Sequence, residues 1–506
     1  MGKTGKQRKK LKQLHAMTTT DTLESDFGTP GLKRSVPDAD TEAEIEEQQG
    51  MECHMIGGTR VSFAEISATM KVLEAFVAAP DALKGNTFKP LRAVLHSLRA
   101  EAKVHAGIGA GASLSGRVGD AVSDQRWQDA MDALSEMRAQ RQYPRLGALQ
   151  RWVRDCDAAA STTTLKRDTQ VMRVLDAILR TADPKTNGAL AAWTSDFKSF
   201  KVVDGIRMLG TWDPYPDRSE KDALVQSGTQ VVPSPEQESR YKPLLKTICQ
   251  EEGHERRPPN HYPMTIYTSD PSIIRYSLNV QPKKIQAPIL QDTILIQNLL
   301  TLDECRQILL AAESVGFTPD EPVVDTANSR STLAHNVIWL TDPKLTQTIH
   351  ERSTPHLPAT MPEDGDVYNN ESTSHRVLDG INPRWRVYRY VPGAIYRPHI
   401  DGGWPKSEYN VDTDTYTFDA SQGSTWSRLT FLIYLNEGFE GGETTYFVPS
   451  KDSVGVLDAK SVVPRAGCAM VFPHGSVKGN LLHEGSGVTK GVKYIARTDV
   501  LYRKVE

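Results

Sequence analysis

The residues of this sequence best suited to chemistry are a histidine and an aspartate separated by one residue, His399 and Asp401. Successive side chains of a β-strand point to opposite faces, so residues two apart share a face. An imidazole and a carboxylate would then point the same way and supply two ligands to a metal ion. His483 is the best candidate for a third ligand, because a strand-like segment carrying cations follows it. Two histidines and one carboxylate leave coordination positions open, an arrangement that suits non-haem Fe(II).

The motifs around these residues resemble those of the Fe(II)- and 2-oxoglutarate-dependent oxygenases, and within that superfamily the prolyl 4-hydroxylase-like branch. A His-x-Asp pair alone is a weak signal for a metal site, whereas an ordered set of flanking motifs is specific. All three ligand positions match the family pattern, so we expect an active enzyme. In chain order the matching segments are Tyr390-Val-Pro-Gly393, Tyr396-Arg-Pro-His399-Ile-Asp401, Leu429-Thr-Phe-Leu-Ile-Tyr-Leu-Asn436, Gly441-Gly-Glu-Thr444, Pro464-Arg-Ala-Gly467, Phe472-Pro-His-Gly475, and His483 with Lys493.

The resemblance implies that a cation beyond the distal histidine holds the far carboxylate of 2-oxoglutarate. Lys493 follows His483 at the spacing found in that branch, whereas the same spacing from His474 leads to Glu484. His483 is therefore preferred over His474 as the metal ligand. Arg497 shares the strand parity of Lys493, and an arginine would pair with a carboxylate bidentately. The resemblance favours Lys493 as the anchor and leaves Arg497 as a helper or a structural ion-pair residue.

Two tyrosines are further candidates for the cosubstrate site. The resemblance places Tyr390 near 2-oxoglutarate and indicates that Tyr434 completes its binding. Each could instead be a buried aromatic of the barrel, and both alternatives stay open. The implied cofactors are Fe(II), 2-oxoglutarate and O2, with L-ascorbate as a further candidate. In the implied reaction 2-oxoglutarate is decarboxylated to succinate while an unactivated C–H bond is hydroxylated.

The sequence defines the substrate less well. The segments expected to face it, Gly402 to Trp426 and Pro449 to Val463, are rich in Asp, Ser, Thr and Tyr and contain no motif. The resemblance makes a prolyl residue of an intracellular protein the leading hypothesis. One fold hosts several substrate classes, so nucleic acid and small molecules are alternatives. A further alternative is a helical scaffold protein with an oxygenase-like sensor domain.

Composition favours an intracellular protein of two or three domains. A chain of 506 residues exceeds what one core organises, and a hydrophobic content of 38% suggests disordered polar segments beside folded parts. The net charge of −3 gives no overall basicity for nucleic acid. The basic amino end lacks the apolar core of a secretory signal, and no run is long enough to span a membrane. We therefore expect a protein of the cytoplasm, the nucleus or both. The scattered cysteines favour reduced thiols and are Cys53, Cys156, Cys249, Cys305 and Cys468.

Composition and periodicity divide the chain into four predicted parts, which together make an α+β multidomain fold. Residues 1–55 form a basic and then acidic tail that we expect to be disordered. Residues 56–205 carry apolar stripes at helical spacing and are predicted to be all-α. Residues 206–288 mix prolines, charges and aromatics without a period and are predicted to be a connector. Residues 289–506 are predicted to be the oxygenase domain, a double-stranded β-helix of the jelly-roll type with support helices.

Two local patterns refine this division. Thr301 and Glu304 fit a capping box at the start of a helix that Gly316 ends, and the resemblance suggests a support helix in front of the barrel. In the helical region, the segment from Trp127 past Pro144 resembles one pentatricopeptide hairpin, although stacked repeats need matching neighbours. We expect this region to bind a partner protein. RNA binding, together with the basic tail, is the alternative.

Overall fold

The structure is a computed structural model of the chain, and it describes twelve stretches of it. These are residues 53–56, 59–78, 86–106, 113–160, 169–183, 202–256, 260–287, 293–321, 334–362, 375–475, 477 and 479–505. The predicted disordered tail lies almost wholly outside the described residues. The chain forms two compact units, residues 1–110 and 111–506.

The first unit contains a hairpin and two helices. Strands β1 (Cys53–Ile56) and β2 (Thr59–Ser62) pair antiparallel, and α3 (Phe63–Ala78) follows directly. Ser62 and Glu65 form reciprocal hydrogen bonds at the start of α3, with Ser62 N donating to Glu65 Oε2 at 2.8 Å and Glu65 N to Ser62 Oγ at 3.2 Å. This exchange satisfies amides that the first helical turn leaves free. A short 3-10 turn, η2 (Asn86–Phe88), then leads into α4 (Lys89–Ala106).

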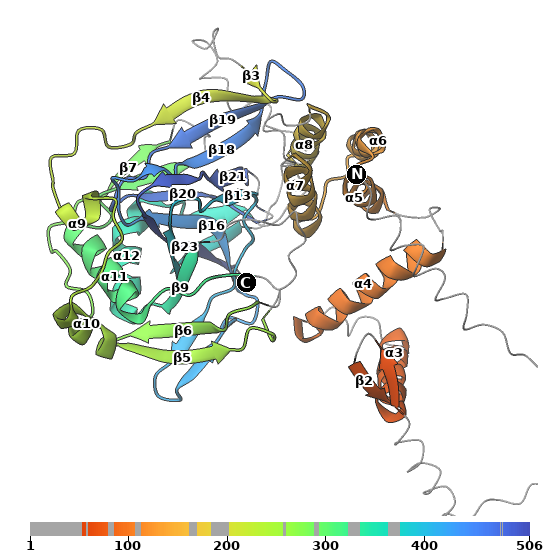
Figure 1. Cartoon of the computed structure of the whole chain (residues 1–506), viewed down its shortest axis with the longest axis horizontal. Helices are drawn as coiled ribbons and strands as arrows, with labels where there is room; N and C mark the ends of the chain where they lie inside the picture. The colour runs from red at the N-terminus through yellow and green to blue at the C-terminus, as the bar shows by residue number, and fades with distance from the viewer. Residues whose placement is uncertain are drawn as a thin grey trace, which may run out of the picture. The chain divides into compact units, whose positions relative to one another are not determined.

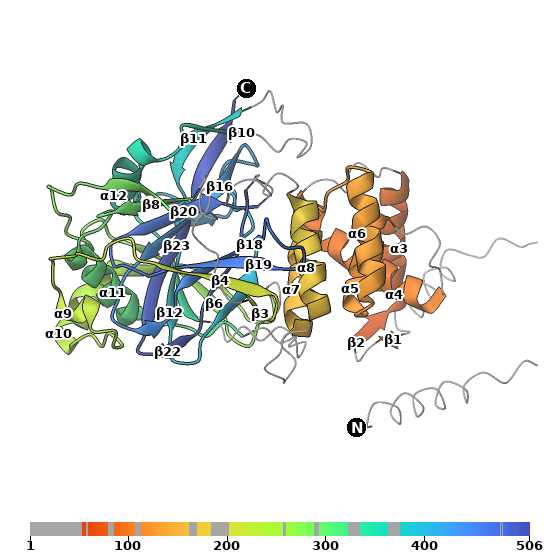
Figure 2. The same ribbon diagram turned by 90° about the horizontal axis from the view of Figure 1, so that it is seen from above.

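The second unit begins with four helices that share one core. They are α5 (Leu114–Ser123), α6 (Trp127–Ala139), α7 (Leu146–Ala160) and α8 (Thr169–Ala182). Trp152 of α7 and Leu134 of α6 are fully buried in this core. The same core continues into the β-domain through Phe447 and Leu482, and Figures 1 and 2 show α7 and α8 beside β18 and β19. These helices are therefore packed on the β-domain.

Two facing sheets form the rest of the unit (Figure 1). The major sheet runs β5-β6-β9-β12-β23-β16-β20-β8-β7, with β11 also paired to β23 and β10 to β11; the minor sheet runs β13-β21-β18-β19-β4-β3. The major strands are β5 (Leu245–Glu251), β6 (Met264–Ser269), β7 (Lys283–Gln286), β8 (Ile294–Gln297), β9 (His335–Leu340), β10 (Thr360–Pro362), β11 (His375–Ile381), β12 (Arg384–Tyr390), β16 (Thr425–Tyr434), β20 (Ala469–Pro473) and β23 (Lys493–Lys504). The minor strands are β3 (Val202–Val203), β4 (Ile206–Trp212), β13 (Tyr396–His399), β18 (Thr444–Pro449), β19 (Leu457–Val462) and β21 (Leu482–Gly485). Two antiparallel strand pairs complete the set: β14 (Glu408–Asn410) with β15 (Thr415–Thr417), and β17 (Glu440–Gly441) with β22 (Val488–Lys490).

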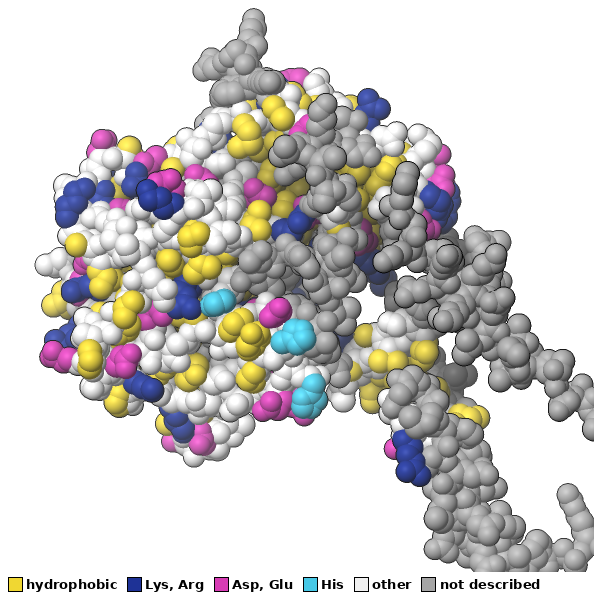
Figure 3. Space-filling model, viewed as in Figure 1, with side chains coloured by type: hydrophobic (Ala, Val, Ile, Leu, Met, Phe, Trp, Pro, Cys, Tyr) yellow, Lys and Arg dark blue, Asp and Glu magenta, His cyan; other side chains and the backbone are white. Residues whose placement is uncertain are grey.

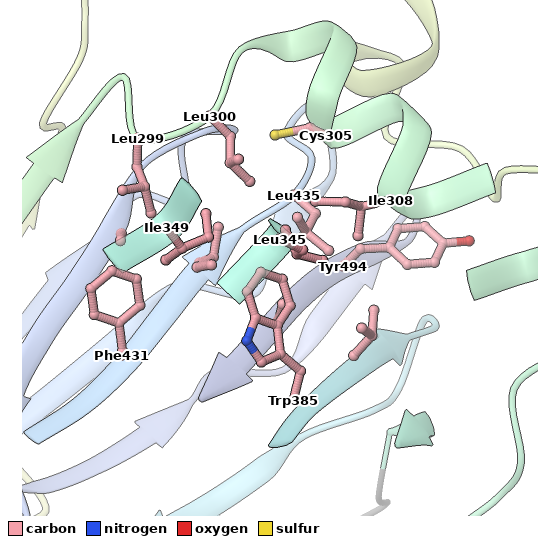
Figure 4. Packing of buried hydrophobic residues seen from close by; sticks show 14 of the residues in the cluster. Leu299, Leu300, Cys305, Ile308, Leu345, Ile349, Trp385, Phe431, Leu435 and Tyr494 are labelled. Atoms are coloured by element: carbon pink, nitrogen blue, oxygen red, sulfur yellow. The ribbon is translucent and has the colours of Figure 1, made fainter. Parts of the chain in front are cut away.

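Alternation along the major strands separates two cores. On β12, Trp385 and Val387 lie in the cluster that covers the outer face, whereas Tyr388 and Tyr390 lie in the cluster between the sheets. This follows from the two-residue period of a strand. The outer cluster packs against helices, as the labelled residues in Figure 4 show. The inner cluster joins side chains of both sheets, which is the arrangement of a jelly roll.

Helices cover the outer face of the major sheet. The main ones are α11 (Leu302–Val315) and α12 (Pro343–Ser353), with α9 (Ala223–Gln226), α10 (Pro235–Tyr241) and the 3-10 turns η5 (Lys242–Leu244) and η6 (Thr354–His356) beside them. The capping box predicted at α11 is present, because Thr301 Oγ1 accepts from Glu304 N at 3.1 Å and Glu304 Oε2 accepts from Thr301 N at 2.9 Å. Gly316, with φ +83°, ends this helix.

Glu304 also forms a buried ion pair that joins α11 to α12. Its carboxylate is 2.8 Å from Arg352 Nη1 and also accepts from Ser277 N. Replacing Glu304 by alanine would leave a buried guanidinium without its anion and remove the cap. We expect Glu304→Ala to lower the free energy of unfolding by about 3–5 kcal/mol, measured by denaturant titration. The exposed control Glu351→Ala should change it by less than about 0.5 kcal/mol. Equal effects of the two variants would contradict this account.

The described part of residues 56–205 is mainly helical, but β2 and β3 are strands. The prediction of an all-α region is therefore not confirmed, since pairing with β1 and β4 draws these short segments into sheets. Residues of the predicted connector supply strands to both sheets, and the predicted domain boundaries stay predictions. In the described stretches, no helix has both the length and the apolar character that crossing a membrane requires.

Candidate metal and cosubstrate site

Two neighbouring strands of the minor sheet bring the predicted metal ligands together. β13 pairs antiparallel with β21, and the register sets His399 directly opposite His483. Asp401 follows β13, and one ligand atom from each of the three residues lies within 4.8 Å of the others. His399 Nε2 is 3.4 Å from Asp401 Oδ1, and His483 Nε2 is 3.6 Å from Asp401 Oδ2. The three residues that the sequence predicted as metal ligands therefore lie in one cluster.

Backbone carbonyls set the orientation of both imidazoles. His399 Nδ1 lies 2.8 Å from the carbonyl oxygen of Arg397, and His483 Nδ1 lies 3.0 Å from that of Leu481. A proton on each Nδ1 would be donated to these carbonyls, which leaves the lone pair of each Nε2 free for a metal. Burial lowers the pKa of His483 to about 4, so its ring is neutral near pH 7. The donor set of two imidazoles and one carboxylate fits a non-haem iron(II) ion.

The carboxylate of Asp401 is ionised. Burial opposes its charge, but Arg497 and the two imidazoles outweigh burial and hold its pKa well below the ordinary value. Arg497 Nη2 lies 3.2 Å from Asp401 Oδ1. An ionised carboxylate between two neutral imidazoles is the protonation state that a metal ligand set needs.

Thr430 and His474 form a buried chain of hydrogen bonds behind Asp401. Thr430 Oγ1 donates to Asp401 Oδ2 at 2.7 Å and lies 2.8 Å from His474 Nδ1. His474 Nε2 in turn lies 2.8 Å from Ser427 Oγ. His474 is 1% exposed and outside the ligand cluster, so it supports the carboxylate indirectly. Sequence reasoning missed this support, although Thr430 lies inside a motif that it had singled out.

The Thr430 hydroxyl should strengthen metal binding by fixing Asp401. Thr430→Val keeps the shape of the side chain but removes the donor. Partners of this kind are worth about 10- to 100-fold in metal affinity, and we expect a loss of that size in an anaerobic Fe(II) titration. The control Thr445→Val removes a buried hydroxyl that bonds Ser461 and Ser486 instead. Unchanged metal affinity in Thr430→Val would show that the hydroxyl has no part in positioning the ligand.

The metal cluster opens into a cavity between the two sheets. Lys493 lines this cavity, is 2% exposed and donates from Nζ to Gly442 O at 2.6 Å. Among the described residues it has no carboxylate within ion-pair distance. Buried cations are rarely left without an anion. The cavity is lined by Tyr388, Tyr390, Tyr396, His399, Asp401, Thr430, Leu432, Thr444, Phe472, His483, Glu484, Gly485, Lys493, Ile495 and Arg497.

The other predicted cosubstrate residues take different positions. Tyr390 lies directly opposite Lys493 on the neighbouring strand, and Lys493 Nζ is 5.3 Å from the centre of its ring. Arg497 lies nearer the metal ligands, where it is paired with Asp401. Tyr434 is behind the cavity wall, and its hydroxyl donates to Thr444 Oγ1 at 2.9 Å. The geometry thus gives Lys493 the unpaired charge; the roles of all four residues stay predictions.

Binding of a carboxylate by Lys493 should depend on pH. Burial lowers the pKa of Lys493 to about 8. The charged amine therefore predominates below pH 8 and is lost as the pH rises through this value, while both carboxylates of 2-oxoglutarate stay ionised. We expect the affinity of the Mn(II)-loaded protein for 2-oxoglutarate, measured by calorimetry, to fall above pH 8. Lys493→Arg should remove this dependence, because arginine keeps its charge. A flat profile for the native protein would contradict the assignment.

A jelly roll with two histidines, an aspartate and a buried lysine around one inner cavity defines a class of dioxygenases, those that depend on Fe(II) and 2-oxoglutarate. Residues 385–498 match the family model for the 2OG-Fe(II) oxygenase superfamily. Residues 385–498 are therefore similar to the 2OG-Fe(II) oxygenases, as the motifs indicated, and the chain also resembles a probable prolyl 4-hydroxylase. Members of the superfamily use Fe(II), 2-oxoglutarate and O2.

Several of the proteins to which this chain is similar are prolyl hydroxylases. Over 122 residues the chain is 30% identical to probable prolyl 4-hydroxylase 9 of Arabidopsis thaliana, which covers 22% of this chain and 38% of that protein. The chain thus spans little more than a third of that curated relative. Among solved structures, a viral collagen prolyl hydroxylase from Paramecium Bursaria Chlorella virus-1 is 20% identical over 43% of this chain and 97% of its own, with a TM-score of 0.25. A prolyl-4-hydroxylase of Pseudomonas putida is 15% identical over 46% of this chain and 99% of its own, also with a TM-score of 0.25.

Proposed function

We propose that this chain is an Fe(II)- and 2-oxoglutarate-dependent dioxygenase that hydroxylates a prolyl residue of a protein. The observation that carries the proposal is that one cavity holds both the cluster of His399, Asp401 and His483 and the unpaired cation of Lys493. 2-Oxoglutarate that chelates the metal through its keto acid end needs a positive charge to pair with its far carboxylate. The cavity supplies both.

The chain's own residues would position and shield the reactants. His399, Asp401 and His483 would hold the metal, and Thr430 would keep the Asp401 carboxylate in place. Lys493 would bind the far carboxylate. Iron(II) with 2-oxoglutarate supplies the power to oxidise an unactivated C–H bond with O2. The tyrosines of the wall exclude water from this space.

Two observations support a prolyl residue as the substrate. Over 122 residues the chain is 30% identical to a probable prolyl 4-hydroxylase. Next to the ligands, the ring of Tyr396 lies 4.1 Å from that of His399, and Tyr388 lies beside Tyr396 at 6.5 Å between ring centres. Aromatic faces next to the metal suit an uncharged, compact ring such as proline.

The test is peptide-dependent release of succinate by the full chain with Fe(II) and 2-oxoglutarate. Mass spectrometry should find a product heavier by one oxygen atom, located on proline. His399→Ala should release no succinate, and a peptide with alanine in place of the modified proline should not be modified. Turnover that survives in His399→Ala would overturn the metal assignment. Oxygen located on another residue would overturn the prolyl assignment alone.

No second function is proposed. On the face seen in Figure 3, Lys and Arg side chains of the described residues are interspersed with Asp and Glu side chains, whereas nucleic-acid binding concentrates positive charge. The basic tail that motivated that alternative lies outside the described residues. Partner binding by the helical region, an intracellular location and the use of L-ascorbate stay predictions.

A further inference from the structure

The inner face of the major sheet carries three arginines beyond the metal cavity. β12 presents Arg384 and Arg386 on the same face as Tyr388, by the two-residue period of a strand. On the neighbouring strand, Arg497 lies directly opposite Arg386. Like charges directly opposite each other on adjacent strands destabilise a sheet. The repulsion between these arginines must therefore be offset by other interactions.

These arginines line a second cavity, which adjoins the metal site. Its walls are Asn382, Arg384, Arg386, Trp404, Arg497 and Asp499. Arg497 lines both this cavity and the one that holds the metal ligands. A molecule that extends from the metal site past Arg497 would enter this second cavity. Lys493, which lines the metal cavity, does not line this second cavity.

The positive charge in this cavity exceeds the negative charge. Among the described residues, the carboxylates within ion-pair distance of the three guanidiniums are Asp401 and Asp499, at 3.2 and 3.6 Å, and both pair with Arg497. Asp401 is also a proposed metal ligand. Arg384 and Arg386 have no carboxylate partner in the described part of the chain. Arg386 Nη1 donates to the hydroxyl of Tyr388 at 3.5 Å.

Some donors in this cavity have no acceptor. Arg384 is 9% exposed, and among the described residues its Nε has no hydrogen-bond partner; the same holds for the Nε atoms of Arg386 and Arg497. A buried donor without a partner destabilises the fold, and more so when it is charged. Guanidinium groups recognise carboxylate and phosphate oxygens with pairs of parallel N–H donors. The missing partner therefore has the chemistry of an oxyanion.

Trp404 holds the guanidiniums in position without neutralising them. Its ring centre lies 4.9 Å from the guanidinium carbon of Arg384 and 5.9 Å from that of Arg386. Trp404 is itself fixed, because its backbone N–H donates to Ser427 Oγ at 2.7 Å and its ring packs edge-on against Phe418. Stacking of this kind pre-orients the N–H edges toward the cavity.

We propose that this cavity is a substrate subsite in which Arg384 and Arg386 bind an oxyanion carried by the peptide next to the hydroxylated residue. The group is the carboxylate of an acidic side chain or the phosphate of a phosphorylated one. This rests on the proposed function, since it assigns the subsite to the substrate of the same centre. It gives that substrate a class: a peptide with an anionic side chain close to the reacting residue.

The test measures probe binding and needs no turnover. The full chain is saturated with Mn(II) and 2-oxoglutarate, so that Lys493 is occupied. It is then titrated by calorimetry with N-acetyl-glutamate amide, N-acetyl-phosphoserine amide and uncharged N-acetyl-glutamine amide. We expect at least one charged probe to bind and the uncharged one not to. Arg384→Gln and Arg386→Gln should each weaken that binding about 10- to 100-fold. The exposed control Arg503→Gln, on β23, should leave it unchanged.

The outcomes separate this proposal from its alternatives. Tighter binding of the glutamate probe identifies a carboxylate, and tighter binding of the phosphoserine probe a phosphate. Absence of binding by both charged probes, or equal binding by native protein and Arg386→Gln, overturns the subsite. Without a probe, Arg386→Gln should melt no lower than the native protein, because it relieves like-charge repulsion; a lower melting temperature with unchanged probe binding assigns Arg386 a structural role instead. Probe binding without hydroxylation of any peptide contradicts the proposed function and leaves the subsite intact.

Discussion

Replacing His483 by alanine is expected to abolish both iron binding and turnover. The variant leaves one imidazole and one carboxylate, and His483 stands directly opposite His399 in the strand register, so no neighbouring side chain takes its place. Loss of a ligand should cost more metal affinity than the about 10- to 100-fold that supporting residues provide. An anaerobic Fe(II) titration and succinate release measure the two effects.

The matched control for this substitution is His254→Ala. His254 is exposed and lies outside the cluster that could hold a metal. The His254→Ala variant should bind one Fe(II) per chain with native affinity and release succinate at the native rate. If His483→Ala kept native iron affinity, the third ligand would have to be another residue. His474, buried behind Asp401, would then be the first to examine.

Replacing Lys493 by methionine should have the second large effect, on 2-oxoglutarate. The amine is buried and its one hydrogen bond is to Gly442 O, so an incoming carboxylate would meet a desolvated charge. Truncating one partner of such a pair costs about 2–5 kcal/mol, or about 30-fold and more in affinity. We expect this weakening in calorimetry of the Mn(II)-loaded protein, with metal affinity unchanged.

Two comparisons make the Lys493 result specific. Lys490→Met removes an exposed lysine that pairs with Glu440, and it should not alter 2-oxoglutarate binding. Arg497→Gln removes the other candidate cation and should weaken 2-oxoglutarate binding less than Lys493→Met, because Arg497 is already paired with Asp401. A larger effect of Arg497→Gln would make the arginine the anchor.

Strand parity was enough to predict part of the site. Lys493, Ile495 and Arg497 are spaced two residues apart along β23, and a two-residue period puts them on one face. Asp401 lies beyond the end of β13, so strand parity alone does not explain why its carboxylate meets the imidazole of His399. The pairing of His399 with His483 could not be obtained this way. It depends on the register between β13 and β21, and only the spacing of a known family suggested it.

The residues that support Asp401 could not be predicted from the sequence for a related reason. The chain from Thr430 to His474 and Ser427 forms only once β16 and β20 are paired. Arg384 and Arg386 become candidates for ligand binding only once β12 is known to pair with β23 and to turn the face that carries them inward.

Helix α7 supports β13 in a way that sequence periodicity could not show. Gln150 Nε2 donates to Ile400 O at 2.8 Å, and Asp157 pairs with Arg397. Both partners lie far away along the sequence. Local periodicity predicted helices in this part of the chain but did not indicate which strand they would support.

A crystal structure of the full chain with Mn(II) and 2-oxoglutarate tests the central claim most directly. We expect one metal ion bonded to Nε2 of His399, Nε2 of His483 and the carboxylate of Asp401, with the far carboxylate of the keto acid on Lys493 Nζ. A metal bound elsewhere, or an imidazole of His483 turned away from the ion, would contradict the account.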